Sequence, residues 1–559
     1  MPDIKYASMP VISLDDRQWP SATITTSPTW CAVDLRDGNQ ALPNPMTPQQ
    51  KQRYFDLLID IGFKEIEVGF PSASQDDFDF VRNLIENGHI PDDVTISVLT
   101  QCRPHLIERT FEAIVGVKNC IFHIYIATSE LHRWFVFGLD DQQVIDTAVT
   151  SMRQIREGVR AMKDSKIMLE FSPEEFTDTT LEYSLEVCDA VVDEWDPDPG
   201  EKVILNLPQT VERRLPNQYA DMIEAFSRRC KYPEQSIISL HVHNDMGMAV
   251  ASTTQALMAG AHRVEGTLFG HGERTGNVDL ITVALNLEYL GIDTGLDFSR
   301  LPEIGQLVTE VTQIEPHPRT PYSGELVFTA FSGSHQDAIH KGLSRKDELT
   351  THFDGWKVPY LHVSPSAIGR EYERFIRINS QSGKGGIAHV LERDFHVQLP
   401  RWVQIDFARH VQSRADDTAR ELSRDEIWDE FTKTYVQSDK PIKLINYWPR
   451  PSDEDPSIID GEVHLTHNGE RQVLRDSGNG PISAFVHALK QIDSMPEFVL
   501  DDYEEETMGR TADAEAVCFV LLSNCETGQQ FIGVGFGGNI DQAAVRAVMS
   551  GVNRMLGAC

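Results

Sequence analysis

The sequence feature that most constrains the fold is a repeated alternation of short apolar segments with amphipathic segments of helical period. Segments that are apolar throughout are typical of parallel strands covered on both faces. Eight such strand–helix units predict a (β/α)8 barrel over 30–324, although periodicity alone also allows a doubly wound open sheet. The eight apolar runs lie near 31–35, 64–69, 94–99, 120–126, 166–171, 202–207, 236–243 and 262–269.

The barrel rhythm stops after the eighth unit, and the remainder of the chain predicts further parts. Residues 325–436 are interpreted as linker subdomains, and 437–456, which contain four prolines, as a linker. Residues 457–559 contain a weak repeat of two ββα-type units, each with a Gly-Asn loop before a helix. We therefore expect a C-terminal α+β domain whose loops either bind a small carboxylate or merely form turns. Residues 1–29 are expected to form an N-terminal arm.

Composition and charge restrict the partners of the chain. A formal net charge of -35 argues against nucleic acid and anionic membrane surfaces as partners. No apolar run approaches the roughly 18–20 residues that a membrane span needs, and the first residues lack the apolar core of a signal peptide. The eight cysteines are scattered without a C-x-x-C pair, which is typical of a reduced protein. We expect a cytoplasmic protein that binds neither nucleic acid nor membranes.

One apolar run carries a candidate metal site. His241 and His243 are two residues apart on a predicted strand, so their side chains point the same way. Asp37 follows the first strand and is a hard oxygen ligand that could join them. Two imidazoles and one carboxylate leave positions open for substrate oxygens, which fits Mg2+ or Mn2+, with Zn2+ as an alternative. The other interpretation is that both histidines are ordinary half-buried residues.

A barrel predicts that polar residues at the ends of its strands share one rim. Arg36, beside Asp37, offers a planar cation for a carboxylate or a developing alkoxide. A 2-oxo acid would chelate the metal, and the metal and Arg36 would together polarise its ketone. Glu273, His335 and Tyr360 are acid–base candidates whose mutual geometry is not evident from the sequence. Further rim candidates are Glu67, Thr100, His123, Tyr125, Glu170, Ser172, Glu174, Asn206 and Thr210.

Several longer motifs resemble the 2-isopropylmalate synthases, which are Claisen-condensing barrels of the pyruvate carboxylase-like family. The resemblance covers nearly the whole chain. Its motifs are 31–40 (CAVDLRDGNQ), 65–72 (EIEVGFPS), 241–245 (HVHND), 272–277 (GERTGN), 331–339 (FSGSHQDAI), 379–386 (NSQSGKGG) and 477–481 (SGNGP).

The resemblance implies an activity and roles for individual residues. Acetyl-CoA would condense with 2-oxoisovalerate, and thioester hydrolysis would give 2-isopropylmalate and CoA in the first committed step of leucine biosynthesis. Asp37, His241 and His243 would hold the divalent metal with Asn277 close by, and Arg36 would stabilise the enolate or alkoxide. The residues matched to the oxo-acid pocket are Leu99, His123, Tyr125, Ser172, Glu174, Asn206 and Thr210.

The same resemblance implies an assembly and its regulation. Glu273 falls on a position used in acid–base work, and His335 and Tyr360 would reach the barrel of the neighbouring subunit in a homodimer. The C-terminal repeat would bind leucine as a feedback ligand. K+ is a further candidate, as an activator.

Five positions depart from the motif residues usual in these synthases, and all five lie in or beside the predicted rim. We hypothesise, as an alternative, a preference for a bulkier or aromatic 2-oxo acid, as in benzylmalate-forming relatives. A metal-dependent aldolase or lyase, and a leucine sensor with an inactive barrel, are further alternatives. The second half of the chain argues against the former, and the complete metal triad argues against the latter. The departures are Ile126 for Asn, Gln209 for Ala, Val242 for Pro, Met246 for Arg and His271 for Asn.

Overall fold

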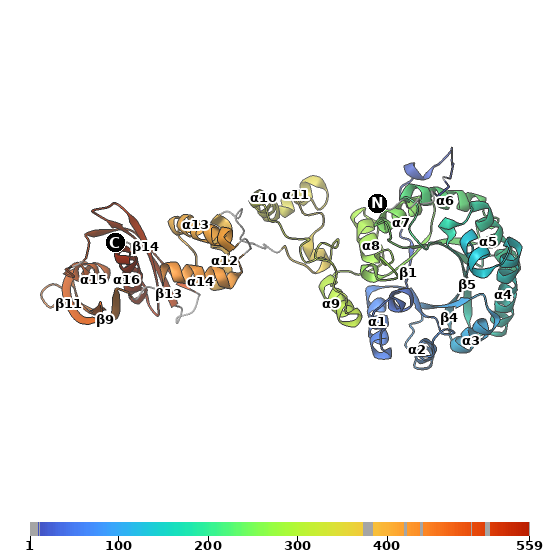
Figure 1. Cartoon of the computed structure of the whole chain (residues 1–559), viewed down its shortest axis with the longest axis horizontal. Coiled ribbons are helices and arrows are strands. Elements are labelled where there is room, and N and C mark those ends of the chain that lie inside the picture. The colour runs from blue at the N-terminus through green and yellow to red at the C-terminus, as the bar shows by residue number, and fades with distance from the viewer. Residues whose placement is uncertain are drawn as a thin grey trace. The chain divides into compact units, whose positions relative to one another are not determined.

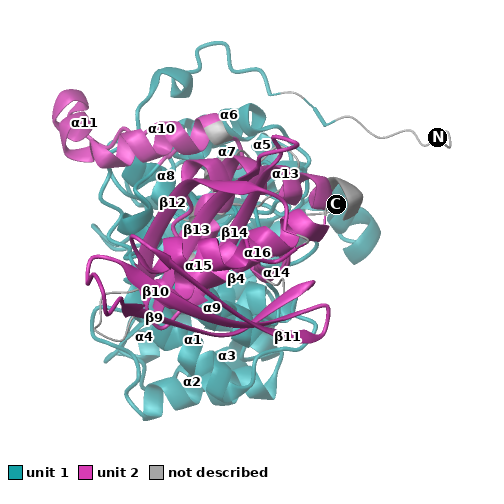
Figure 2. Ribbon diagram, turned by 90° about the vertical axis from the view of Figure 1, so that its left-hand side faces the viewer, with its two compact units in different colours: residues 1–328, 363–372 teal, residues 329–362, 373–559 magenta. Residues whose placement is uncertain are grey.

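The computed structural model describes most of the chain as two compact units. Unit 1 comprises residues 1–328 and 363–372, and unit 2 comprises 329–362 and 373–559 (Figure 2). Part of the 379–386 motif lies outside the described residues. The described residues are 9, 10, 12–372, 384–418, 422–436, 440–493, 495–508 and 515–557.

Unit 1 contains a closed barrel of eight parallel strands (Figure 1). The barrel closes because β8 pairs with β1, with Thr29 opposite Arg263 and Ala32 opposite Gly266. This closure confirms the predicted barrel and excludes the open sheet. The strands are β1 (Thr29–Ala32), β2 (Glu65–Gly69), β3 (Thr95–Gln101), β4 (Asn119–Ala127), β5 (Lys166–Glu174), β6 (Val203–Gln209), β7 (Ser236–Val242) and β8 (Arg263–Gly266).

Helices surround the barrel on its outer side (Figure 1). Local sequence explains where several of them begin: Thr47 and Asp140 each form a capping box with the residue three positions later. A final helix, α9 (Leu301–Thr312), follows the barrel. The surrounding helices are α1 (Pro48–Ile61), α2 (Gln75–Glu86), α3 (Pro104–Ile114), α4 (Asp141–Ala161), α5 (Leu181–Trp195), α6 (Pro216–Arg229), α7 (Ala249–Met258) and α8 (Leu280–Tyr289).

The part of the N-terminal arm that the structure describes is tied to helix α6. Arg17 donates two hydrogen bonds to the carboxylate of Asp221, at 2.8 and 2.7 Å. The indole of Trp19 donates to the same carboxylate, and the backbone N–H groups of Gln18 and Trp19 donate to Glu224. Two buried carboxylates on α6 thus hold this segment against the barrel.

Unit 2 begins with helices and ends with two sheets. Each sheet is followed by one helix that packs against it. The two-fold repeat expected from the sequence is present, but each half has three strands and one helix where two strands and one helix were predicted. The helices are α10 (Gly333–Ser344), α11 (Lys346–Phe353), α12 (Lys384–Phe395), α13 (Arg401–Thr418) and α14 (Arg424–Tyr435). The first half is β9 (Ile442–Pro451), β10 (Ile459–His467), β11 (Glu470–Gly478) and α15 (Pro481–Leu489), and the second is β12 (Phe498–Met508), β13 (Glu515–Asn524), β14 (Gln530–Gly537) and α16 (Ile540–Gly557).

Strand β9 corrects the sequence-based interpretation of 437–456 as a linker. Residues Ile442–Pro451 within it pair antiparallel with β10, with Ile442 opposite His467 and Pro451 opposite Ile459. The prolines of this segment favour a linker when only the sequence is considered, because proline has no backbone N–H to donate a hydrogen bond within a sheet. The described sheet has the order β11-β10-β9, so β9 lies at an edge where prolines are tolerated.

No described helix has both the length and the apolar composition that a bilayer crossing requires.

Candidate active site and metal centre

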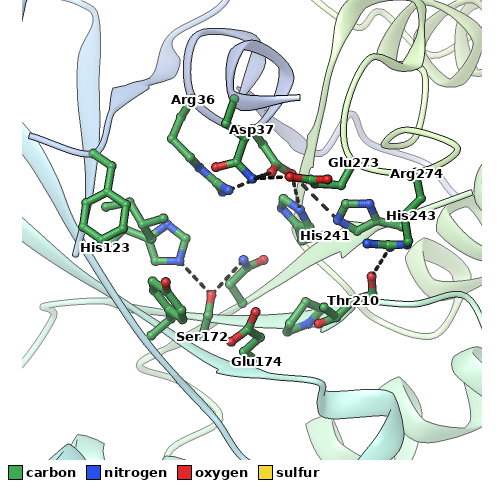
Figure 3. A pocket seen from close by; sticks show the side chains of 16 residues that line it. Arg36, Asp37, His123, Ser172, Glu174, Thr210, His241, His243, Glu273 and Arg274 are labelled. Carbon is green, nitrogen blue, oxygen red and sulfur yellow. Dashed lines mark hydrogen bonds and ion pairs between the residues drawn. The ribbon is translucent and has the colours of Figure 1, made fainter. Parts of the chain in front are cut away.

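A cavity of about 330 Å³ opens at the carboxyl ends of the barrel strands (Figure 3). It brings together all of the residues that the sequence proposed for catalysis, substrate and metal, except Asn277, His335 and Tyr360. The side chains come from separate strands and loops, as a barrel mouth requires. The lining residues are Arg36, Asp37, Gln40, Phe70, Leu99, His123, Tyr125, Ser172, Glu174, Asn206, Pro208, Thr210, His241, His243, Glu273 and Arg274.

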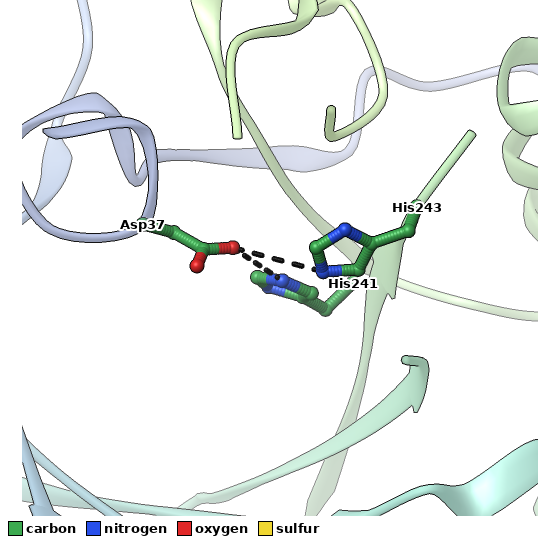
Figure 4. A group of neighbouring side chains, drawn as sticks. All are labelled: Asp37, His241 and His243. Atoms are coloured by element: carbon green, nitrogen blue, oxygen red, sulfur yellow. Dashed lines mark hydrogen bonds and ion pairs between the residues drawn. The ribbon is translucent and has the colours of Figure 1, made fainter. Parts of the chain in front are cut away.

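Asp37, His241 and His243 form a buried cluster whose ligand atoms lie within 4.8 Å of one another (Figure 4). Asp37 Oδ2 is 3.1 Å from His241 Nε2 and 3.7 Å from His243 Nε2. Within the described residues, His243 Nδ1 is buried without a hydrogen-bond partner. Two imidazoles and a carboxylate converging on one point fit a divalent cation, and the cavity beside them leaves room for substrate oxygens.

Glu265 orients one of these imidazoles from behind. His241 Nδ1 donates to Glu265 Oε2 over 2.8 Å, which leaves Nε2 facing the cluster. The carboxylate of Glu265 is itself held by Arg263, at 2.8 Å, and by the Asn206 amide, at 3.0 Å. The tautomer and ring orientation of His241 are therefore set by buried partners.

The charges of the cluster are unequal. Burial opposes ionisation of Asp37, but Arg36 and His241 outweigh it and hold its pKa well below the usual range. Burial would lower the pKa of His241, yet its bonds to Asp37 and Glu265 raise it to about 9. Burial, and then repulsion from His241, lowers the pKa of His243 to about 4. The imidazole of His241 therefore favours the protonated form, in which each ring nitrogen faces one carboxylate, Nδ1 that of Glu265 and Nε2 that of Asp37.

Arg36 is a fixed cation at the cavity. Its Nε donates to Glu67 Oε1 over 2.5 Å, and its Nη1 lies 2.9 Å from Asp37 Oδ1. Burial alone would lower the pKa of this guanidinium. The carboxylates of Asp37 and Glu67 outweigh burial and raise the pKa above its usual value, so the group remains charged. A charged planar group of this kind can bind a carboxylate or an oxyanion.

A chain of hydrogen bonds crosses the cavity floor from Asn206 to Glu67. The Asn206 amide donates to Ser172 Oγ over 3.0 Å, and Ser172 Oγ is 2.7 Å from His123 Nε2. His123 Nδ1 is 2.6 Å from Glu67 Oε2. Because Glu67 accepts the proton at Nδ1, His123 Nε2 accepts from the serine. The pocket presents a defined tautomer to any ligand.

Two carboxyl groups in the cavity are available for acid–base work. Glu174 is largely buried, and that burial raises its pKa. Glu273 is exposed and lies 3.5 Å from the amide of Gln40, which also donates to Asp37 Oδ1 over 3.0 Å. Gln40 thus connects the loop carrying Glu273 to the metal cluster.

Four of the lining residues were given no role from the sequence: Gln40, Phe70, Pro208 and Arg274. Pro208 could have been found, because it lies between Asn206 and Thr210 on the same strand. Arg274 follows Glu273 directly and pairs with Asp245 at 2.7 Å. No local signal distinguishes Phe70 from an ordinary core residue.

Three of the residues proposed for catalysis or metal binding do not line the cavity, and the rim candidates Glu67, Thr100 and Glu170 are fully buried outside its lining. Asn277 forms an isolated β-bridge with His243, and its amide donates to the carbonyl of His271 over 3.0 Å. His335 and Tyr360 belong to unit 2, where their rings stack with centroids 3.9 Å apart. Tyr360 is 63% exposed and has a φ of 61°. The roles of Asn277, His335 and Tyr360 stay predictions.

The structure describes all five residues that depart from the family motifs, and none of them lines the cavity. Gln209 pairs with Val242 across β6 and β7, and both side chains are fully buried. Strand alternation explains this placement: Pro208 faces the cavity, so its neighbour Gln209 faces away. The geometry therefore gives no basis for the bulkier acceptor that the departures led us to consider.

Three family models match successive parts of the chain. The HMGL-like model matches residues 27–308, and the model for the "alpha-isopropylmalate synthase, post-catalytic domain-like" region matches 325–392. The "LeuA allosteric (dimerisation) domain" model matches 421–556. Together with the closed barrel and its buried Asp–His–His cluster, these matches define an HMGL-like barrel enzyme with a C-terminal allosteric domain.

Curated relatives resolve the class further. A 2-isopropylmalate synthase of Rhodospirillum rubrum is 48% identical over 99% of both chains. One from Paraburkholderia xenovorans is 48% identical over 99% of this chain and 95% of its own, and one from Acetoanaerobium sticklandii is 44% identical over 99% and 96%. The chain belongs to the 2-isopropylmalate synthase family. The alternatives of an aldolase, an inactive sensor or a bulkier acceptor are not favoured.

Proposed function

We propose that this protein condenses acetyl-CoA with 2-oxoisovalerate and hydrolyses the resulting thioester to give 2-isopropylmalate and CoA. The observation that carries the proposal is the Asp37–His241–His243 cluster, with Arg36 beside it, at the mouth of a cavity sized for a small 2-oxo acid. Identity to 2-isopropylmalate synthases along the whole chain supports the choice of acceptor.

The cluster would hold Mg2+ or Mn2+, with Zn2+ as the less suitable ion for an open site with a carboxylate ligand. Bound there, the metal would act as a Lewis acid on the ketone of the 2-oxo acid. Arg36 stabilises negative charge that develops on oxygen, and Glu67 keeps the guanidinium in place. Asn277, which pairs with His243 through an isolated β-bridge, is proposed to support the metal-binding residues from there.

The remaining lining residues would recognise the 2-oxo acid. Phe70, Leu99 and Pro208 supply an apolar wall for the branched side chain. The hydroxyl groups and amides of the cavity floor can bond the carboxylate and keto oxygens. Proton transfer is proposed for Glu273 and for the raised-pKa carboxyl of Glu174, which both line the cavity. The polar recognition set is His123, Tyr125, Ser172, Glu174, Asn206 and Thr210.

Assembly and regulation are part of the proposal. The match to a dimerisation domain supports a homodimer, in which His335 and Tyr360 would act at the partner's barrel. The allosteric part of the same description supports leucine as feedback ligand. A cytoplasmic location is proposed as well, supported by the cysteines of the described residues, which are free thiols as in a reducing compartment.

The test is release of CoA thiol from acetyl-CoA across a panel of 2-oxo acids. The panel contains 2-oxoisovalerate, pyruvate, 2-oxoglutarate, phenylpyruvate and oxaloacetate, with Mg2+ or Mn2+, with and without K+, and after chelation. Strong metal-dependent release with 2-oxoisovalerate, inhibited by leucine, is the expected result. Release only with another acceptor would overturn the substrate assignment, and no release at all would overturn the activity.

A further inference from the structure

Glu175 occupies a backbone conformation that its residue type disfavours. It directly follows β5, with φ 60° and ψ 36°, in the left-handed region, and its side chain is buried. A residue with a Cβ pays about 1 kcal/mol or more to sit there, and glycine or asparagine is the usual occupant. A buried glutamate in this conformation indicates that its carboxylate has a use.

The carboxylate is fixed by two side chains from the loop after β4. His132 Nδ1 donates to Glu175 Oε2 over 2.6 Å, and the hydroxyl of Ser129 donates to the same oxygen. Ser129 Oγ in turn accepts from the backbone N–H of His132 over 3.2 Å. This loop continues into a π-helical turn, Leu131–Phe137, whose apolar side chains are largely exposed while His132 and Arg133 point inward. The anchor therefore joins the loops after β4 and β5.

The backbone of Glu175 contacts the substrate cavity. Its N–H donates to Thr210 Oγ1 over 2.8 Å, and Thr210 lines the cavity from the loop after β6. Its carbonyl accepts from Thr179 Oγ1 over 2.8 Å. The residue before it, Glu174, lines the same cavity. The left-handed conformation aims the N–H of residue 175 at Thr210 while the side chain turns towards the β4 loop.

We propose that Glu175 is a positioning residue: the Ser129–His132–Glu175 anchor holds the strained peptide whose N–H fixes the hydroxyl of Thr210 for binding of the 2-oxo acid. This inference rests on the proposed function, because Thr210 is assigned there to the oxo-acid pocket. Glu175 itself does not line the cavity, so it acts through Thr210. The anchor thereby fixes the positions of the loops after β4, β5 and β6 relative to one another around the oxo-acid pocket.

The test removes the anchor without adding backbone strain. Glu175→Gly adopts the left-handed conformation freely, so the variant is expected to fold and bind metal as the wild type does. We expect its KM for 2-oxoisovalerate to rise about tenfold, with KM for acetyl-CoA unchanged. The reason is that the contacts of the Glu175 carboxylate with Ser129 and His132, which hold the peptide that positions Thr210, are lost. Glu175→Gln keeps an acceptor for Ser129 and His132 and is expected to restore KM to within about threefold of the wild type.

A double-mutant cycle with Thr210→Ala shows whether Glu175 acts through that residue. Glu175→Gly is expected to have no further effect in the Thr210→Ala background. The matched control is Asp196→Gly, which makes the same change at another left-handed position, φ 53°, at the exposed end of α5. It is expected to leave both KM values unchanged.

Equilibrium binding of 2-oxoisovalerate by calorimetry keeps the inference separate from the activity. Lack of turnover by the wild-type protein would contradict the proposed function, while binding weakened about tenfold by Glu175→Gly would still support positioning. Unchanged binding and KM in Glu175→Gly would overturn the inference. Additive effects of the Glu175 and Thr210 substitutions would overturn it as well.

Discussion

Glu265 on β8 accepts a hydrogen bond from Nδ1 of His241 on β7, with 2.8 Å between the two atoms. This contact decides which imidazole nitrogen faces Asp37. It joins the metal cluster to the charged groups buried inside the barrel, where Arg263 pairs with both Glu265 and Glu170. The ligand set thus depends on a residue that does not itself line the cavity.

Substituting Glu265 is expected to weaken metal binding without changing the ligands. Glu265→Gln keeps the shape of the side chain but removes the charge that orients and polarises His241. We expect affinity for Mn2+ to fall about 10- to 100-fold, as is typical of loss of such outer contacts. Titration calorimetry measures the affinity. Glu182→Gln, which alters an exposed ion pair with Arg229, is the control and should leave affinity unchanged. An undiminished affinity in Glu265→Gln would contradict the role.

Metal binding is expected to release a proton from His241. Its pKa of about 9 means that the metal-free imidazole is charged at pH 7.5, whereas a ligand imidazole must be neutral. His243, with a pKa of about 4, is already neutral there. Mn2+ affinity should therefore increase from pH 7 to about pH 9 and then level off. Calorimetry in buffers of different ionisation enthalpy should show about one proton released per ion. No proton release at pH 7.5 would contradict this charge distribution.

Asp34 is expected to make the protein less stable as pH rises. Its Oδ1 accepts from the Tyr54 hydroxyl and the Leu268 N–H, but among described residues its buried Oδ2 has no partner. Burial raises the pKa of Asp34 to about 7, against about 4 in an unfolded chain. The folded state binds the extra proton, so this contribution is complete below about pH 4 and is lost as pH rises towards 7.

The measurement is the midpoint of thermal unfolding between pH 5 and pH 8. Asp34→Asn keeps the Oδ1 acceptor and cannot ionise, so it should reduce the fall in stability over that interval by up to about 3 kcal/mol. Asp60→Asn, at an exposed position on α1, should leave the pH dependence unaltered. An identical pH dependence in wild type and Asp34→Asn would refute the expectation.

Gln209 is expected to be replaceable by an apolar residue of similar shape. It is fully buried, and neither of its side-chain polar atoms has a hydrogen-bond partner among the described residues. Gln209→Met removes that deficit and should raise the free energy of unfolding by about 1–3 kcal/mol. Because the side chain faces away from the cavity, the ratio of kcat/KM for phenylpyruvate to that for 2-oxoisovalerate should not change. A large change in this ratio would revive the bulkier-acceptor alternative.

Features that depend on local sequence were predicted well. The eight strands follow from continuous apolar runs separated by segments of helical periodicity. The shared direction of His241 and His243 follows from the two-residue period of a strand. Once a barrel was expected, the shared rim placed Asp37 and Arg36 near them.

Features that depend on pairing between distant segments were decided by the tertiary structure. Strand β9 carries prolines that favour a linker, and only its pairing with β10 makes it a strand. Gln209 lies beside the site in sequence, but strand register turns it away from the cavity. The sequence by itself determined the succession of strands and helices in the barrel and the residue types at the rim, because these follow from local periodicity. Only the tertiary structure decided which side chains share the cavity and which buried groups hold them, because that depends on register between segments far apart in the chain.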